Sequence, residues 1–326
     1  MKKNYNNKNR ENREGGERRE NRDGNRNHGR SGERRENRDG GERRRYDNNN
    51  PKFQKNDAAA SKSEFQKNPM GFLVISLFVK AKTDFNIVAD SIESAMKIDS
   101  KKKIVISFED KNDKSLISSI KKKFEGAFGV FFYTPKGSMK SNSTLNSSMI
   151  HTEVLNSFKS NFFLTLDANI TVREFSIEKM IGFLCKPGDV LAVSPKFYSL
   201  EKEIIHNCKR FFALKDFLPS SESKKKTLAD EHFMMERGEV GYYSIHRVDY
   251  GNLDCMLFLT EALLKIKSFS CFSSQDLRDA MTCKNFSKKT KGKIMFYPHA
   301  RVLSSEPAEE KPSTVEKIKY LLASIF

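Results

Sequence analysis

Asn161-Phe-Phe-Leu-Thr-Leu-Asp167-Ala-Asn169-Ile-Thr-Val172 is an apolar run that ends in a carboxylate, and it is the most informative segment of the chain. Residues 162–166 are predicted to form a buried strand, after which the chain turns at Asp167. Open α/β sheets bind ligands at the carboxyl ends of their strands, so Asp167 is a candidate for holding a nucleotide or a metal. A strand that merely ends at a turn-favouring Asp is the alternative.

Apolar runs alternate with segments of helical spacing from Pro69 to Leu166. Strands are expected at 71–79, 103–108, 129–133 and 162–166, and helices at 84–96, 115–124 and 143–157. A continuous apolar run such as 71–79 is typical of a strand buried on both faces. Alternation at this spacing predicts right-handed crossovers, and therefore a mainly parallel sheet flanked by helices, in the α/β class.

Acidic and amide side chains follow two of the expected strands. Glu109, Asp110 and Asp113 come after the strand 103–108, and Asp167 and Asn169 come after the strand 162–166. The carboxyl ends of parallel strands meet at one edge of a sheet, so these groups are expected to face the same crevice. Each could instead serve only as a helix cap or a turn residue.

A third acidic position opens a later helical run. Asp276 begins this run, and a strand is expected over residues 292–303. Asp276 as a plain N-cap is the alternative to a functional role.

The first 69 residues differ in kind from the rest. The sequence Gly-Glu-Arg-Arg-Glu-Asn-Arg-Asp-Gly occurs at 16–24 and again at 32–40. Residues 1–69 hold 20 Lys and Arg against 12 Asp and Glu, within a net charge of +17 for the whole chain. Dense charge and low hydrophobicity predict a disordered, basic N-terminal tail, which could contact RNA or an anionic membrane, or simply be solvated. The expected domains are the tail at 1–69, one α/β domain at 70–305, and a linker and helix at 306–326.

Composition also limits the location and the chemistry. The five cysteines form no Cys-x-x-Cys pair, the chain opens without an apolar leader, and its apolar stretches are too short to span a bilayer. A cytoplasmic location is therefore expected, either free or peripheral to the inner face of the membrane. There is no Gly-x-Ser-x-Gly elbow and no P-loop, so acyl hydrolase and P-loop NTPase chemistry have no support.

The order of these motifs resembles that of the family 2 glycosyltransferases, which bind nucleotide sugars on a GT-A fold. The resemblance covers roughly residues 71–305. The matched elements are Glu109, Asp110 and Asp113 at the nucleotide position, Ser143 to Asn146 at the Ala-x-x-Asn helix start, Asp167-Ala-Asn169 at the Asp-x-Asp position, Ser274-Gln275-Asp276 at the Glu-Asp position, and 292–302 at the closing strand.

The resemblance implies a GT-A-like domain that transfers a sugar from a nucleotide-sugar donor to a glycan, lipid or protein acceptor. Glu109, Asp110, Asp113, Asn146 and Asp167 would then bind the nucleotide. Asp167 and Asn169 would hold Mg²⁺ or Mn²⁺, and Asp276 would be the catalytic base of an inverting reaction.

Two alternatives remain open from the sequence. Asn169 stands in place of an acid and Gln275 in place of the Glu of the Glu-Asp pair, which fits a catalytically degenerate, glycosyltransferase-like binding protein. The basic tail alternatively fits an RNA-associated protein. The chain has no Trp and hence no Gln-x-x-Arg-Trp motif, which disfavours a processive synthase.

Overall fold

The computed structural model describes residues 65–110, 113–136, 138–205, 208, 209, 211, 243–305 and 318. All of them belong to one compact unit, Lys55–Phe326. The repeats of the expected tail and nearly all of 306–326 lie outside the described residues, so the disorder and the terminal helix stay predictions. Phe65, inside the expected tail, is buried, and Lys67 Nζ donates to the carbonyl oxygen of Val190 at 2.9 Å.

The strands and helices expected between residues 71 and 166 are confirmed, with shifts of at most two residues at their ends. They are β1 (Leu73–Val79), α1 (Phe85–Met96), β2 (Lys102–Phe108), α2 (Lys114–Phe124), β3 (Val130–Tyr133), α3 (Ser143–Ser157) and β4 (Phe162–Asp167). The later helix and strand are confirmed as α8 (Gln275–Thr290) and β12 (Lys293–Ser304). The remaining elements are β5 (Ile170–Val172), α4 (Ser176–Leu184), β6 (Val190–Ser199), β7 (Ile204–Ile205), β8 (Cys208–Lys209), β9 (His246–Val248), β10 (Tyr250–Gly251), β11 (Cys255–Leu259) and α7 (Thr260–Leu264).

One mixed, mostly parallel sheet organises the domain. Its strand order is β3-β2-β1-β4-β11-β6-β12-β5, with β7 paired to β6 and β9 paired to β12. The block β3-β2-β1-β4 is parallel throughout, as expected, and β6 is parallel to β12. β11 runs antiparallel to both β4 and β6, so it joins the two parallel parts.

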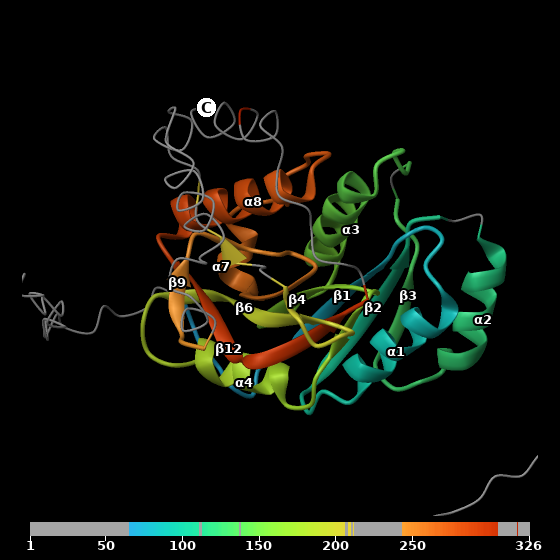
Figure 1. Ribbon diagram of the computed structural model, residues 1–326, viewed down its shortest axis with the longest axis horizontal. Helices are drawn as coiled ribbons and strands as arrows, with labels where there is room; N and C mark the ends of the chain where they lie inside the picture. Colours follow the sequence, from blue (N-terminus) through green and yellow to red (C-terminus); the bar gives the residue numbers. More distant parts are fainter. Residues whose placement is uncertain are drawn as a thin grey trace, which may run out of the picture. The chain divides into compact units, whose positions relative to one another are not determined.

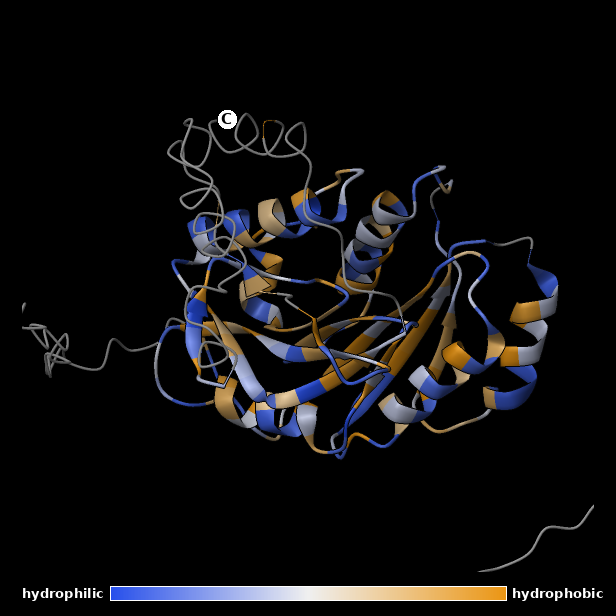
Figure 2. Cartoon of the chain, viewed as in Figure 1, coloured by the Kyte–Doolittle hydropathy of each residue, from blue (hydrophilic) through white to orange (hydrophobic). Residues whose placement is uncertain are grey.

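Helices flank the sheet on both faces (Figure 1). α1 and α4 cover one face, with α2 packed against α1, while α3, α7 and α8 gather on the other. Every residue of β1 and β4 is buried, because each strand is covered on both faces. Apolar residues accordingly concentrate on the central strands, and polar ones on the outward sides of the helices (Figure 2). Among the described residues, no helix combines the length and the hydropathy needed to cross a bilayer.

The strand register brings several polar residues to one edge of the sheet. Phe78 of β1 lies opposite Asp167, and Val79 lies opposite Phe108, so β1, β2 and β4 end at the same level. The antiparallel β11 starts where β4 ends, and the backbone N–H of Asp167 donates to the carbonyl oxygen of Asp254 at 2.8 Å. This edge therefore brings together residues from strands far apart in the sequence.

Candidate active site

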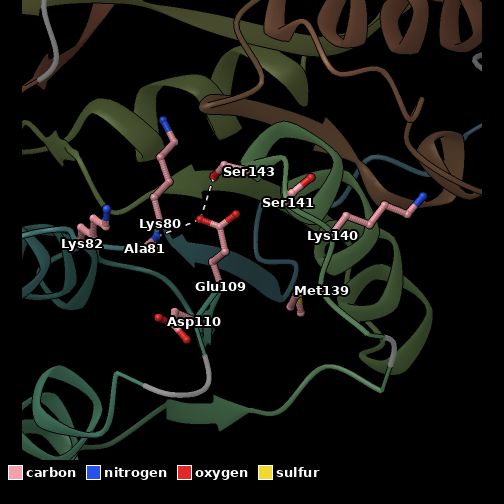
Figure 3. A pocket seen from close by; sticks show the side chains of 9 residues that line it. All are labelled: Lys80, Ala81, Lys82, Glu109, Asp110, Met139, Lys140, Ser141 and Ser143. Atoms are coloured by element: carbon pink, nitrogen blue, oxygen red, sulfur yellow. Dashed lines mark hydrogen bonds between the residues drawn. The ribbon is translucent and has the colours of Figure 1, made fainter.

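Glu109 joins three segments at the carboxyl end of β2. Its Oε2 accepts from the backbone N–H of Ala81 at 2.8 Å and from the Ser143 hydroxyl at 2.9 Å, while its Oε1 accepts from the Asn146 side-chain amide at 2.8 Å. These bonds connect the end of β1 to the start of α3 (Figure 3). Glu109 thus shapes the crevice that it was predicted to line.

Asn146 is fully buried and holds the loop in front of α3. Its Oδ1 accepts from the Lys140 N–H, and its Nδ2 donates to the Lys140 carbonyl oxygen, both at 2.8 Å. Together with the bond to Glu109, these contacts give both the oxygen and the nitrogen of the Asn146 amide hydrogen-bond partners in the protein. The structure therefore places Asn146 as a residue that positions the loop and Glu109.

A pocket of about 530 Å³ opens at this edge of the sheet. Its walls are Lys80, Ala81, Lys82, Glu109, Asp110, Met139, Lys140, Ser141 and Ser143 (Figure 3). The volume falls in the range of small-molecule and cofactor sites, and three lysines beside two carboxylates suit a ligand with both phosphates and hydroxyl groups. Glu109 and Asp110 line the pocket as expected, whereas Asp113 is the N-cap of α2, where its carboxylate accepts from the Leu116 N–H at 3.0 Å.

Asp167 is the last residue of β4 and Asn169 lies in the turn that follows, and both are buried. Lys80, which lines the pocket, places its Nζ 3.2 Å from Oδ2 of Asp167. Neither polar atom of the Asn169 amide has a hydrogen-bond partner among the described residues. Leaving a buried amide unpaired costs about 1–3 kcal/mol, so the described residues alone do not account for the position of the Asn169 amide.

A buried ion cluster, which the sequence analysis missed, supports this turn from the α8 side. Arg278 is 3% exposed and donates to Asp279 Oδ1 at 2.6 Å, Asp254 Oδ1 at 3.1 Å and the Ser147 hydroxyl at 3.1 Å. The Gln275 amide donates to the other Asp254 oxygen at 2.7 Å. The cluster joins α8, α3 and the start of β11, directly behind Asp167.

The buried acid Asp254 and the buried base Arg278 both stay charged. Burial alone would raise the pKa of the Asp254 carboxyl, but Lys80 and Arg278 together hold it below its ordinary value. Burial likewise opposes the charge on Arg278, yet Asp279 and Asp254 raise the pKa of the guanidinium. Asp254 is therefore an ionised acid beneath the candidate site.

Asp276 lies in the first turn of α8, one residue from Gln275. Its Oδ1 is 2.6 Å from Nζ of the buried Lys209, and the Tyr250 hydroxyl is 3.2 Å from each of its oxygens. The carboxylate keeps 17% of its surface exposed, so one side stays accessible. Asp276 is linked to Asp167 indirectly. Its neighbour Gln275 donates to Asp254, whose carbonyl oxygen accepts from the Asp167 N–H.

Of the expected site residues, Glu109 and Asp110 line the pocket. Asn146 bonds to Glu109, and Asp167 pairs with Lys80 of the pocket wall, whereas Asn169 and Asp276 do not line it. Asp113 lies apart as a cap. Within the part of the chain that the structure describes, no three His, Cys, Asp or Glu side chains cluster as a metal site. Asp167 and Asn169 would offer two oxygen ligands.

We expect Glu109→Gln to destabilise the domain by about 1–3 kcal/mol, because one of the three donors around Glu109 would then face an amide N–H₂. Urea unfolding followed by circular dichroism measures this. Glu125→Gln, an exposed position at the end of α2, is the matched control. Equal unfolding midpoints for the two variants would show that the Glu109 bonds do not hold the crevice.

Comparison with known proteins supports the fold. No family model and no curated protein sequence matches the chain. The crystal structure of GalNAc-T7 with UDP, GalNAc and Mn²⁺ aligns over 78% of this chain and 48% of that one, with a TM-score of 0.52 and 11% identity. The mannosyltransferase PcManGT from Pyrobaculum calidifontis, in complex with GDP-Man and Mn²⁺, covers 75% of this chain and 60% of its own at a TM-score of 0.48 and 11% identity.

The first alignment defines the class of fold. The described domain has the GT-A-type fold of glycosyltransferases, as the sequence predicted. The chain spans about half the length of GalNAc-T7. Membership of family 2 in particular stays a prediction.

Proposed function

We propose that this protein is a glycosyltransferase that moves a sugar from a nucleotide-sugar donor to an acceptor hydroxyl. The observation that carries the proposal is the carboxyl end of β4. There buried Asp167 pairs with Lys80 in the wall of a pocket of about 530 Å³, and the amide of Asn169 has no partner among the described residues. This is the edge at which α/β sheets bind nucleotides. GalNAc-T7, which shares the fold, binds UDP and Mn²⁺ in its crystal structure.

The residues that line the pocket have proposed roles in holding the donor. Asp110 would accept hydrogen bonds from the base or the ribose, and Glu109, whose oxygens already accept from three protein donors, could accept at most a further bond at Oε1. Lys80, Lys82 and Lys140 would contact the phosphates, since each lines the pocket. Asn146 would act indirectly by positioning Glu109 and the loop that carries Lys140.

A divalent cation fits the turn after β4. Asp167 would supply a carboxylate oxygen, and Asn169 the amide oxygen that has no hydrogen-bond partner within the described part of the chain. Mg²⁺ is commonly held by one or two protein oxygens together with substrate phosphates, so this sparse set is adequate. The cation would neutralise charge on the leaving pyrophosphate.

Transfer needs a base on the acceptor side, and Asp276 is the proposed one. The acceptor oxygen would attack the anomeric carbon and lose its proton to Asp276, while the bond to the phosphate breaks and the nucleoside diphosphate leaves. Lys209 and Tyr250 would hold the Asp276 carboxylate in place, since both contact it. Attack from the side opposite the leaving group inverts the anomeric configuration.

Asp276→Asn is expected to lower kcat for transfer by about 10²–10⁴-fold while leaving donor affinity unchanged, because general-base catalysis contributes on that order. Steady-state kinetics and donor titration calorimetry separate the two effects. Asp189→Asn removes a half-exposed carboxylate that pairs with Lys293 and is the control. Unchanged kcat in Asp276→Asn would exclude it as the base.

A degenerate binding protein is the second candidate. The ion pair between Lys80 and Asp167 favours it, because an ammonium group already occupies one side of the carboxylate that a cation would use. Titration calorimetry with UDP, GDP and their sugars, with and without Mn²⁺, distinguishes the two. Absence of binding to every nucleotide would contradict both candidates, and binding without turnover would favour the second.

A further inference from the structure

A second pocket lies over α4, β6 and β12, and it shares no lining residue with the donor pocket. It has a volume of about 620 Å³. Its walls are Arg173, Glu174, Ser176, Lys179, Tyr198, Lys202, His299, Arg301 and Leu303. α4 lies on the face of the sheet opposite α3 and α8 (Figure 1), so this basic pocket is on the other side of the domain from Asp276.

The side chains that line the basic pocket are mostly positively charged. Arg173, Lys179, Lys202 and Arg301 line it, and Glu174 is the single acidic residue in its wall. All four basic residues are exposed, and none of them forms an ion pair with any residue that the structure describes. Four uncompensated cations around one hollow attract an anionic group, because phosphate binding would neutralise their mutual repulsion.

The N-terminus of α4 adds to the positive potential of the basic pocket. Ser176, its first residue, lines the pocket, and the N-cap residue Phe175 makes no side-chain capping bond. The amides at a helix N-terminus carry a partial positive charge, which Glu178 in the first turn of α4 offsets only in part. Helix and side chains therefore favour the same sign of ligand.

Exposed apolar residues lie next to the basic pocket. Phe175 is 55% exposed and Leu200 is 62% exposed. Both line a neighbouring cavity of about 800 Å³ that shares Arg173, Glu174 and Leu303 with the basic pocket. The cations lie in the basic pocket, whereas the cavity lined by these two apolar side chains also carries the carboxylates of Asp90, Glu93, Glu174 and Glu178. The basic pocket and the two apolar side chains together form an amphipathic surface.

The backbone of Phe175 is also unfavourable. Its φ is 57°, in the left-handed region. A residue with a Cβ pays about 1–2 kcal/mol there, and Gly or Asn would fit better. The Phe175 side chain is neither buried nor engaged in a capping bond. Contacts among the described residues therefore do not offset the cost of this backbone conformation, which is the kind of strain that marks functional sites.

We propose that the basic pocket binds the phosphate headgroup of an anionic membrane lipid, while Phe175 and Leu200 enter the membrane interface. The cations match the headgroup and the adjacent apolar side chains match the acyl region, a combination typical of peripheral membrane binding. An aliphatic side chain such as that of Leu200 gains nothing from RNA, which favours the lipid. The inference does not rest on the proposed sugar transfer.

The test is co-sedimentation of the full-length chain with phosphatidylcholine vesicles that contain or lack phosphatidylserine. Each basic residue near an anionic surface contributes on the order of 1 kcal/mol, so the double variant Lys179→Gln, Arg301→Gln is expected to lower the partition coefficient roughly ten- to thirtyfold. The control Lys288→Gln, Lys289→Gln removes the same charge from exposed positions of α8. It is expected to bind as the unmodified chain does.

Phe175→Asn tests the apolar contribution separately. It is expected to weaken binding to the phosphatidylserine vesicles without lowering the melting temperature, because Asn tolerates the left-handed conformation. Loss of binding at unchanged or raised stability rules out an unfolding artefact.

Three results would overturn the proposal. The first is equal vesicle binding by the pocket variant and the α8 control. The second is binding of inorganic phosphate at the pocket, seen by calorimetry, with vesicle binding unchanged in the pocket variant. The third is a loss of single-stranded RNA affinity in the pocket variant while vesicle binding persists, which would identify RNA as the partner.

Discussion

Asp167→Asn is expected to abolish the cation-dependent part of nucleotide binding and to reduce kcat/KM for sugar transfer by about 10²–10³-fold, the effect typical of removing one electrostatic stabiliser. Asp167 is 1% exposed at the end of β4, and Asn keeps its shape while removing its charge. Lys80, its partner, is 25% exposed and can turn to water, so the fold should survive. Calorimetric titration with UDP and GDP, with and without Mn²⁺, measures the change.

The neighbouring position offers the reverse experiment. Asn169→Asp should raise Mn²⁺ affinity, because a second carboxylate would replace the amide that has no partner among the described residues. Opposite shifts in the two variants would locate the cation between these side chains. If Asp167→Asn bound nucleotide and Mn²⁺ as the unmodified chain does, the proposed donor site would be wrong.

The parallel half of the fold could be predicted because its signals are local. β1 and β4 are continuous apolar runs, and Asp84 caps α1 as expected of an Asp before a helical pattern. Their shared carboxyl edge follows from the handedness of parallel crossovers. Glu109, Asp110 and Asp167 could therefore be assigned to that edge from the sequence, whereas Asp254 could not.

The antiparallel β11 could not be predicted in the same way. Its register places Asp254 beside Asp167, a contact between residues far apart in the chain. Glu109 shows a second limit, since the sequence does not reveal that its oxygens are taken by Ala81, Ser143 and Asn146. Such pairings are set by packing between elements and leave no local pattern.

Helix geometry explains why Arg278 was missed. It follows Asp276 by two residues, which at 3.6 residues per turn places the two on nearly opposite sides of α8. Asp276 meets Lys209, whereas Arg278 faces Asp254 and Asp279. An Arg near the start of a helix usually lies in solvent, so burial alone distinguishes this one.

Arg278→Met is expected to destabilise the domain by about 3–5 kcal/mol, because it leaves Asp254 and Asp279 buried without their cation. Urea unfolding at neutral pH measures the loss. Arg247→Met, at an exposed position on β9, is the control and should change stability by less than about 0.5 kcal/mol. Adding Asp254→Asn to Arg278→Met should recover part of the loss, since it removes one of the two unpaired charges.

The pH dependence separates lost charge pairing from lost packing. In the unmodified chain the pKa of Asp254 lies below its unfolded value of about 3.9, so its ionisation stabilises the fold above that pH and this contribution is lost as the pH falls through the folded pKa. Without Arg278, one of the two cations that oppose the effect of burial is gone, so the pKa of Asp254 rises and its ionisation stabilises the fold less. The stability difference between the chains should therefore shrink as the pH falls towards 4. A difference that stays constant with pH would mean that Arg278 acts through packing, and that Asp254 is not held ionised behind Asp167.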